Sequence, residues 1–410
     1  MRIRVCVIGL GYVGLPLILN LSKKINCVGF DVDRSRIENL KLKKDTNKEF
    51  KPINFEKKKI IFTSNIDQIR NCNFYIVCVP TPITSRKKPD LNNLNLAIKL
   101  ISKILKKGDI VFIESTIYPG LTEQYKLSLE KTTKLKHNKD FYVGYSPERV
   151  NPGDKINTLN NINKIVSIDT DRKEILSKVF KIYNLVSKKI IFSKNIRSAE
   201  TAKVIENIQR DLNIALMNEI LLICKKLNIN FNEVIRLAET KWNFLKFNPG
   251  LVGGHCLPVD PYYLSSIAAK NNFKTAVTLS GRKVNDSMSN FIIEEIKNFL
   301  KLKNKSLRYA NILLIGISYK SGIADMRNSI NFKILKKLIQ YSKNVEAYDP
   351  YVKDEIKSKY KFIKDISLKN KYDSIIFLSK HRKFKEVYKK LNTKKNKSKL
   401  LDPFEYYRIS

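Results

Sequence analysis

Residues 1–14 read Met1-Arg-Ile-Arg-Val-Cys-Val-Ile-Gly9-Leu-Gly11-Tyr-Val-Gly14, and in them an apolar run leads into three glycines spaced as Gly-x-Gly-x-x-Gly. The apolar run predicts a buried strand. The glycines predict a tight turn that opens a helix, because glycine lets the backbone bend sharply and approach a ligand closely. Strand, turn and helix in this order are typical of a dinucleotide-binding domain, so this stretch predicts the fold of the N-terminal part.

A second apolar run, Cys27–Asp31, ends in an acid at the distance from the glycines where a carboxylate binds the adenosine ribose. Such a carboxylate accepts hydrogen bonds from the ribose hydroxyls and repels a 2′-phosphate, so Asp31 predicts NAD rather than NADP. Arg2 and Arg4 before the first apolar run could suggest a secretory leader. The glycine spacing and Asp31 favour the strand, turn and helix instead.

The first part of the chain alternates short apolar runs with helical patterns, which predicts a parallel sheet covered by helices. The expected strands are Arg4–Ile8, Cys27–Asp31, Phe74–Val79, Ile110–Glu114 and Phe141–Tyr145. From Ser198 to about Cys224 the pattern is helical and contains no Pro or Gly. It predicts one long helix, which we interpret as a connector and a dimer face.

The last third of the chain starts a second, smaller α/β part. Strands are expected at Tyr309–Gly316, Asn344–Tyr348 and Tyr372–Leu378, and no Gly-x-Gly-x-x-Gly occurs there, so a nucleotide sugar is the expected ligand. The predicted fold class is α/β with three parts: a Rossmann-type NAD-binding domain (1–196), a central helical dimerisation region (197–300) and a C-terminal nucleotide-sugar-binding domain (301–410).

The 410 residues include 78 basic and 38 acidic ones, which gives a net charge of +40. This charge raises the question of nucleic-acid or membrane partners, but the lysines are spread along the whole length without a basic tail, so neither partner is expected. The six cysteines form no CxxC pair and no zinc spacing, which predicts no metal and a reducing cytoplasm. No stretch approaches the length of a membrane span.

The segment Leu251-Val-Gly-Gly-His-Cys256-Leu-Pro-Val-Asp260-Pro-Tyr-Tyr263 places a cysteine after two glycines and four residues before an aspartate. Glycine frees the backbone and proline stiffens the residues next to it, so the segment can present a thiolate nucleophile beside a carboxylate that orients water. A buried structural cysteine fits the same segment, and both interpretations stay open here.

These motifs together resemble the UDP-glucose/GDP-mannose dehydrogenase family almost from end to end. The segments that carry the resemblance are Gly9–Pro16, Val79–Pro82, Glu114–Gly120, Tyr145–Gly153, Lys203–Asn207, Gly253–Pro261, Gly281–Asp286 and Lys320–Arg327. Members of this family oxidise C6 of a nucleotide-bound sugar to a carboxylate with two NAD⁺. The resemblance therefore implies an NAD-dependent oxidoreductase that works through a covalent cysteine thioester.

The resemblance also implies site residues. The catalytic set is Cys256 as nucleophile, Lys203 and Asn207 for the oxyanion, Asp260 and Thr116 as positioners of water, and Glu148 as general base. The cofactor set is Gly9, Gly11, Tyr12, Val13, Gly14, Asp31, Arg34, Pro80, Thr81, Thr116 and Arg327. The substrate set is Glu148, Arg149, Lys203, Asn207, Gly253, Gly254, Arg282 and Lys320, with Arg282 acting within one chain or across a dimer.

Each implied role has a plainer alternative. Lys203, Arg282, Lys320 and Arg327 could be ordinary basic surface, Glu148 a surface ion pair, Thr116 a helix cap, and Asp260 a turn residue before Pro261. His255 adjoins Cys256 in sequence, and adjacent side chains seldom point to one spot. We therefore interpret it as loop structure or a substrate contact rather than as the base for Cys256.

The branch of the family is indicated by His255 and Val259, where UDP-glucose and GDP-mannose dehydrogenases typically carry Ser and Lys. With Tyr118-Pro-Gly120 and residues 202–219, they resemble the UDP-N-acetyl-D-glucosamine/galactosamine 6-dehydrogenases, which serve O-antigen and Vi-type capsule polysaccharides. Ser321-Gly-Ile323 and the tail from Leu401 depart from the family pattern, which leaves the C-terminal substrate contacts open. A UDP-glucose 6-dehydrogenase and a non-catalytic nucleotide-binding protein remain as alternatives.

Overall fold

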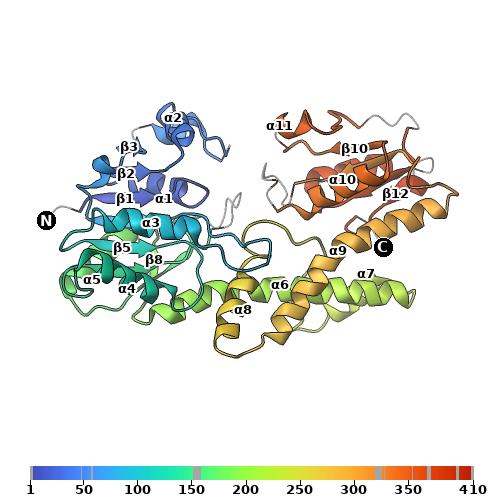
Figure 1. The fold of residues 1–410 in the computed structure, drawn as a ribbon. Helices are drawn as coiled ribbons and strands as arrows, with labels where there is room; N and C mark the ends of the chain where they lie inside the picture. Colours follow the sequence, from blue (N-terminus) through green and yellow to red (C-terminus); the bar gives the residue numbers. More distant parts are fainter. Residues whose placement is uncertain are drawn as a thin grey trace. The chain divides into compact units, whose positions relative to one another are not determined.

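The computed structural model describes residues 3–47, 49–56, 59–150, 158–318, 326, 328–352, 354–366, 371–393 and 397–407. The chain forms two compact units. The N-terminal unit comprises Met1–Glu206 and Tyr262–Lys274, and the C-terminal unit comprises Asn207–Pro261 and Thr275–Ser410 (Figure 1). The three-part division expected from the sequence stays a prediction.

The N-terminal unit is built on an eight-stranded sheet of order β3-β2-β1-β4-β5-β6-β7-β8. The strands are β1 Val5–Ile8, β2 Cys27–Phe30, β3 Ile60–Thr63, β4 Phe74–Val77, β5 Ile110–Ile113, β6 Tyr142–Tyr145, β7 Asn163–Ile168 and β8 Lys189–Ser193. Only the β6–β7 pairing is antiparallel among these neighbours. The order of the first six strands is that of the Rossmann fold, so the predicted fold class is confirmed.

Helices pack on this sheet and bury its apolar strands (Figure 1). They are α1 Gly14–Leu21, α2 Arg34–Lys41, α3 Asn92–Ser102, α4 Leu121–Thr133, α5 Lys173–Tyr183 and, for residues 262–270, α8 Asp260–Lys270. Strands β1, β4, β5 and β6 are buried at every position, as parallel strands covered on both faces require. All five expected strands are confirmed, with ends shifted by one or two residues.

Three strands of this unit were not expected from the sequence. β3 and β8 lie at the two edges of the sheet, where all but one of their nine residues are partly or fully exposed, and each has only three consecutive apolar residues next to polar ones. β7 begins with Asn163 and Lys164, although Lys164 is buried. Polar residues in such places hide a strand from an argument that relies on apolar runs.

The C-terminal unit carries a four-stranded parallel sheet of order β10-β9-β11-β12. Its strands are β9 Ile312–Ile315, β10 Val345–Tyr348, β11 Ser374–Phe377 and β12 Leu400–Leu401; its helices are α7 Phe231–Ala238, α9 Ala276–Lys301, α10 Ile330–Tyr341, α11 Asp354–Lys357 and α12 Arg382–Leu391. The expected long helix is α6, Ile196–Lys226, which begins in the N-terminal unit and continues into this one. Two apolar clusters form the core around the sheet.

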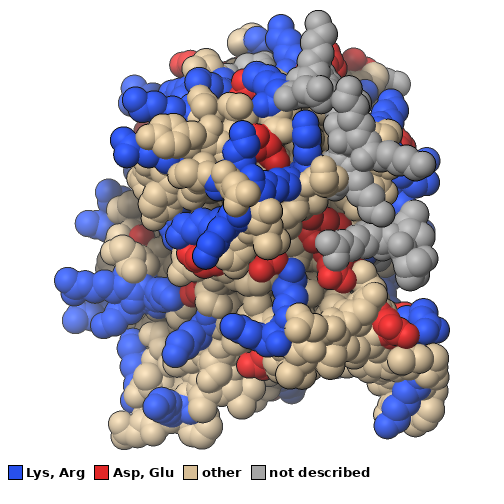
Figure 2. Space-filling model, turned by 90° about the vertical axis from the view of Figure 1, so that its right-hand side faces the viewer, with Lys and Arg blue, Asp and Glu red and all other residues tan. Residues whose placement is uncertain are grey.

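On the face drawn in Figure 2, basic side chains are scattered and do not form one patch. Figure 2 shows Lys and Arg spread over the viewed face, with acidic and uncharged residues between them. This distribution follows from lysines placed along the whole sequence. Among the residues that the structure describes, no helix has both the length and the apolar character needed to cross a membrane.

Candidate active site

The glycine-rich turn follows β1 and opens α1, and each of its glycines has a different surrounding. Gly9 has φ +89°, a left-handed conformation that side chains disfavour. A Cβ on Gly14 would lie 1.8 Å from the carbonyl oxygen of Gly9, so the turn packs directly on the helix start. A Cβ on Gly11 would meet nothing within 4 Å, so the backbone there is open to a ligand.

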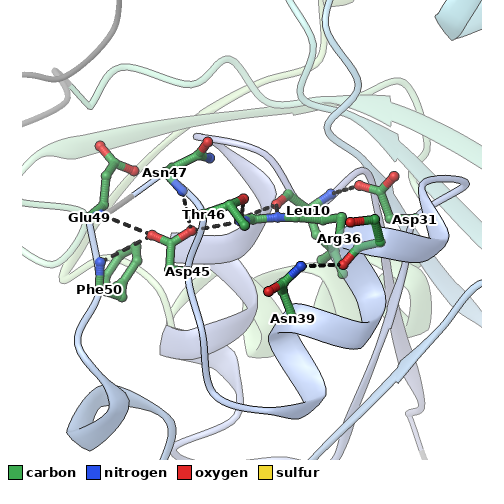
Figure 3. A network of polar contacts seen from close by, with 10 residues as sticks. Leu10, Asp31, Arg36, Asn39, Asp45, Thr46, Asn47, Glu49 and Phe50 are labelled. Atoms are coloured by element: carbon green, nitrogen blue, oxygen red, sulfur yellow. Dashed lines mark hydrogen bonds and ion pairs between the residues drawn. The ribbon is translucent and has the colours of Figure 1, made fainter. Parts of the chain in front are cut away.

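The peptide groups of Leu10, within the turn, are held from two sides (Figure 3). The Leu10 N–H donates to Asp31 Oδ2 at 2.8 Å, and its carbonyl accepts from Arg36 Nε at 3.0 Å and Nη2 at 2.9 Å. Arg36 is itself fixed by Asp45, whose Oδ1 lies 2.8 Å from Nη1. The turn is therefore preorganised, as a site for a pyrophosphate at a helix N-terminus requires.

A cavity of about 710 Å³ opens beside the end of β2. Its lining includes Phe30, Arg34, Ser64, Asn65, Leu96, Lys99 and Lys103. Arg34, predicted to bind the cofactor, is exposed at the start of α2 and faces this cavity. With the open Gly11 and the free start of α1, the cavity gives the N-terminal unit the features that an adenine dinucleotide needs. Among the described residues no group of His, Cys, Asp and Glu could hold a metal ion.

Two further predicted cofactor residues lie together in this unit. Thr81 Oγ1 donates to the carbonyl of Thr116 at 2.7 Å. The hydroxyl of Tyr263 donates to the carbonyls of Thr81 and Pro82 at 3.0 and 3.1 Å, so α8 holds the same loop. Pro80 is exposed and its carbonyl accepts from Asn93.

Thr116 does not cap a helix. The helix after it, α4, begins at Leu121 and its N-cap is Gly120 with φ +91°. The buried carboxylate of Glu200 accepts from the N–H groups of Gly120 and Thr122 at 2.5 and 2.9 Å and satisfies the helix start. Burial raises the pKa of Glu200, although these hydrogen bonds oppose the shift. Because the capping alternative is excluded, Thr116 is available for another role.

Glu148 is held by a buried lysine rather than by a surface ion pair. Its Oε2 lies 3.7 Å from Lys164 Nζ, and Lys164 has no exposed side-chain area. Its Oε1 accepts from the N–H groups of Arg149 and Val150 at 2.7 and 2.5 Å. The same ammonium contacts Glu114 Oε2 at 2.7 Å. The carboxylate of Glu148 is therefore fixed at both oxygens and remains partly exposed.

Lys203 in α6 is 8% exposed, so it is not a solvated surface lysine. It makes no hydrogen bond or ion pair with any residue that the structure describes. Arg149, by contrast, is exposed and pairs with Glu206 at 2.7 Å. Both residues stay predictions as substrate contacts.

Cys256 is the one exposed cysteine of the six, and the other five are buried. Gly254 before it has φ +92°, a conformation that favours glycine. The carbonyl of Cys256 accepts from the N–H groups of Val259 and Asp260 at 3.0 and 2.8 Å, which closes a turn that leads into α8. Exposure argues against the alternative of a buried structural cysteine.

Asp260 and Asn207 are brought together in the C-terminal unit. Asn207 Nδ2 donates to Asp260 Oδ2 at 2.6 Å, and Asp260 is 1% exposed. A residue that only forms a turn before Pro261 would need neither this burial nor this hydrogen bond, so the structure argues against that alternative for Asp260. Asp260 also donates its backbone N–H to the carbonyl of Cys256, so Asn207, Asp260 and Cys256 form one hydrogen-bonded group.

Arg282 lies in a buried polar network of the C-terminal unit. It is 2% exposed and its Nη1 lies 2.6 Å from Asp211 Oδ1. Asn285 donates to the same aspartate and accepts from Asn218, which in turn makes two hydrogen bonds with the backbone of Gly250. Ordinary basic surface is therefore excluded for Arg282. The network connects α6 and α9 to the start of the cysteine segment.

Two predicted residues, Lys320 and Arg327, lie outside the described residues. The other site residues divide between the units. Thr116, Glu148, Arg149, Lys203 and the cofactor residues 9–14, 31, 34, 80 and 81 belong to the N-terminal unit, and Asn207, Gly253, Gly254, Cys256, Asp260 and Arg282 to the C-terminal unit. Sequence reasoning did not identify Arg36, Lys164 or Asn218, since none of them belongs to a motif of fixed spacing.

Comparisons with known proteins cover the whole site. Models of the UDP-glucose/GDP-mannose dehydrogenase family match the chain with its NAD binding domain at residues 3–186, its central domain at 197–287 and its UDP binding domain at 313–408.

Two relatives are UDP-N-acetyl-D-glucosamine 6-dehydrogenases. That of Salmonella typhi is 42% identical over 94% of this chain and 92% of its own length. That of Pseudomonas aeruginosa is 40% identical over the same shares. The solved structure of a UDP-D-ManNAc dehydrogenase from Pyrococcus horikoshii has a TM-score of 0.87 and 31% identity, over 100% of this chain and 97% of that one.

Proposed function

Since the chain belongs to the UDP-glucose/GDP-mannose dehydrogenase family, whose NAD binding domain it contains, we propose that it oxidises C6 of a UDP-N-acetylhexosamine to the uronate. The observation that carries the proposal is the exposed Cys256 on a turn that leads to the buried Asp260. The relatives from Salmonella typhi and Pseudomonas aeruginosa, named for UDP-N-acetyl-D-glucosamine, support the choice of substrate class. We propose that the product serves a surface polysaccharide.

Bound NAD⁺ supplies an acceptor for the hydride that leaves C6 in each of two oxidations. The chain supplies the other groups. In the first oxidation the C6 hydroxyl gives its proton to a water molecule as the hydride departs, and an aldehyde forms. The ammonium of Lys203, buried and without an ion-pair partner among the described residues, can stabilise the oxygen that becomes negative. Asn207, four residues later in α6, shares its helix face.

The thiolate of Cys256 then forms a C–S bond with the aldehyde carbon and produces a thiohemiacetal. Loss of a second hydride from that carbon leaves a thioester. The intermediate stays attached to the chain, so no free aldehyde is released between the two oxidations. This step needs the exposure of Cys256, because a buried thiol could not reach a sugar.

Hydrolysis completes the reaction. Water adds to the thioester carbon, the C–S bond breaks and the Cys256 thiolate leaves. Glu148 is partly exposed and held at both oxygens, which suits a general base that takes the proton of this water. We assign the orientation of the water to Asp260 and Thr116.

We also propose that the active form is a homodimer. Leu216, Ile223 and Leu227 are 50%, 50% and 62% exposed, and their spacing of seven and four residues places them on one side of α6 and its C-terminal end. A row of exposed apolar side chains on a long helix is suited to a second copy of the same helix.

The test of the substrate is a panel of UDP-GlcNAc, UDP-GalNAc, UDP-ManNAc and UDP-glucose, each mixed with purified protein and NAD⁺. Formation of NADH with an N-acetylated sugar and not with UDP-glucose is the expected result. Turnover of UDP-glucose alone would favour the UDP-glucose 6-dehydrogenase alternative and overturn our interpretation of His255 and Val259. No NADH with any of the four would favour a protein that binds nucleotides without catalysis.

A further inference from the structure

Lys164 is a lysine without any exposed side-chain area, in a chain whose other basic residues mostly cover its surface. It lies in β7, which pairs antiparallel with β6 through Gly144↔Ile168 and Tyr145↔Ser167. Glu148 lies three residues past the end of β6, and the Ser146 hydroxyl donates to the carbonyl of Ile165 at 2.7 Å, so the two segments stay adjacent beyond the paired residues. The pairing of β6 and β7 therefore brings Lys164 close to the predicted general base.

Among the described residues, the ammonium of Lys164 makes three polar contacts, all within the N-terminal unit. Its Nζ lies 2.7 Å from Glu114 Oε2 and 3.7 Å from Glu148 Oε2, and it donates to the carbonyl of Pro147 at 3.2 Å. Glu114 follows β5 and is 1% exposed, whereas the side chain of Glu148 is 11% exposed. In the group of Glu114, Lys164 and Glu148, the carboxylate of Glu114 is thus buried, whereas that of Glu148 reaches solvent.

A buried charge is costly unless an opposite charge lies beside it, and the two carboxylates beside Lys164 are sufficient to keep it protonated. Burial alone would lower the pKa of Lys164, but Glu114 and Glu148 outweigh it and raise the pKa, so the group is an ammonium ion. Burial raises the pKa of Glu114, and the charge of Lys164 opposes this rise. Glu114 is therefore the internal counter-charge that keeps an ammonium beside Glu148.

We propose that Lys164 is a positioning residue for hydrolysis: its ammonium, anchored by Glu114, holds the Glu148 carboxylate and the Pro147 carbonyl in one fixed orientation, in which Glu148 takes the proton of the hydrolytic water. This inference rests on the proposed function. The water oxygen forms the new C–O bond, its proton passes to Glu148, and the electron pair of the C–S bond returns to Cys256. Lys164 exchanges no proton in this step and acts only through Glu148.

The experiment compares Lys164→Met with the wild-type enzyme in two separate measurements. Stopped-flow NADH absorbance reports the oxidations that precede hydrolysis. Intact-protein mass spectrometry on quenched samples reports the sugar attached to Cys256. We expect the first NADH to form at the wild-type rate, while steady-state turnover falls about 10- to 100-fold and the adduct accumulates, because a mispositioned base loses part of the roughly 10²- to 10⁴-fold that general-base assistance contributes. A merely structural role would slow both phases together.

Lys164→Met leaves Glu114 buried without its partner, so the double variant Lys164→Met/Glu114→Gln is measured as well. The double variant removes both charges and leaves no unpaired carboxylate in the interior. We therefore expect it to fold even if Lys164→Met alone does not. It should show the same accumulated adduct, because Glu148 has again lost its neighbour. The matched control is Lys126→Met, which removes another buried lysine of this unit, one paired with Asp169. This control should hydrolyse the thioester normally.

The proposal is overturned if the folded double variant hydrolyses the thioester at the wild-type rate, or if both phases slow equally. It is also overturned if Lys126→Met accumulates the adduct to the same extent. If the wild-type enzyme forms no NADH with any sugar nucleotide, the proposed function fails and this inference fails with it. Activity in the wild type together with normal hydrolysis in the double variant would remove this inference alone.

Discussion

At the scale of single residues, Cys256 stands apart from the other five cysteines by its exposure. Changing Cys256 to Ser keeps the size of the side chain and removes the thiolate. We expect full turnover to be lost, with at most the first oxidation remaining, because serine is a much weaker nucleophile at neutral pH. NADH and uronate are measured together. Uronate at the normal rate from Cys256→Ser would contradict the thioester mechanism.

Arg36 is the second residue with a specific expectation, since both its Nε and its Nη2 hold the carbonyl of Leu10. Arg36→Met should raise KM for NAD⁺ about tenfold and leave kcat within about twofold, because the turn loses its preorganised shape before the cofactor binds. Asp45 keeps three backbone N–H donors, so it is not left unsatisfied.

Steady-state kinetics at saturating UDP-sugar measures the effect of Arg36→Met. The control is Arg70→Met, which removes an exposed arginine paired with Asp67 in the same unit. An unchanged KM for NAD⁺ in Arg36→Met would mean that the glycines alone shape the turn.

Among single residues, the sequence predicts some members of the candidate site and misses others. Cys256, Asp260 and the glycines of the turn follow from residue types at a fixed spacing. Lys164 does not, because the role that we propose for it depends on contacts with Glu114 and Glu148, which lie on other segments of the chain, and no spacing in the sequence expresses such contacts. A lysine among so many lysines carries no signal by itself.

At the scale of elements, Asp109 at the start of β5 is 2% exposed, and burial raises its pKa to about 6, against the opposing hydrogen bond from the Lys106 N–H. The folded state therefore prefers the protonated acid. The stability that this proton provides is present below the ordinary pKa of 3.8 and is lost as the pH rises through 6.

Asp109→Asn keeps an acceptor for the Lys106 N–H and removes the buried charge. At pH 7.5 it should raise the apparent melting temperature by about 2–4 °C, and at pH 4 the gain should be smaller. Thermal unfolding at the two pH values is the measurement. A gain of the same size at both would mean that ionisation of Asp109 is not its cause.

Elements also differ in how clearly the sequence predicts them. Central strands such as β1 and β5 are apolar at every position and were predicted nearly to their ends. The edge strands β3 and β8 were missed, since each has an apolar run of only three residues next to polar ones. β12 has only two residues, too few for any pattern.

At the scale of the whole molecule, we expect a homodimer because one side of α6 exposes apolar side chains. Leu216→Glu combined with Ile223→Glu should shift the protein from dimer to monomer, because two charges cannot be buried against a second copy of α6. Light scattering after gel filtration measures the mass. A double variant that stays dimeric would place the interface elsewhere.

The net charge of +40 also acts at this scale. It should attract the anionic UDP-sugar, so raising NaCl from about 50 to 300 mM should increase KM several-fold with little change in kcat, as screening shortens the reach of the charges. A KM independent of salt would mean that the charge plays no part in substrate capture.

The central claim is a twofold oxidation on one cysteine, and its most direct measurement is the number of NADH formed for each UDP-N-acetylhexosamine consumed. Absorbance gives the NADH, and chromatography of the sugar nucleotides gives the substrate lost and the uronate formed. The account predicts two NADH per uronate and no free aldehyde. One NADH per sugar, with the aldehyde released into solution, would contradict it.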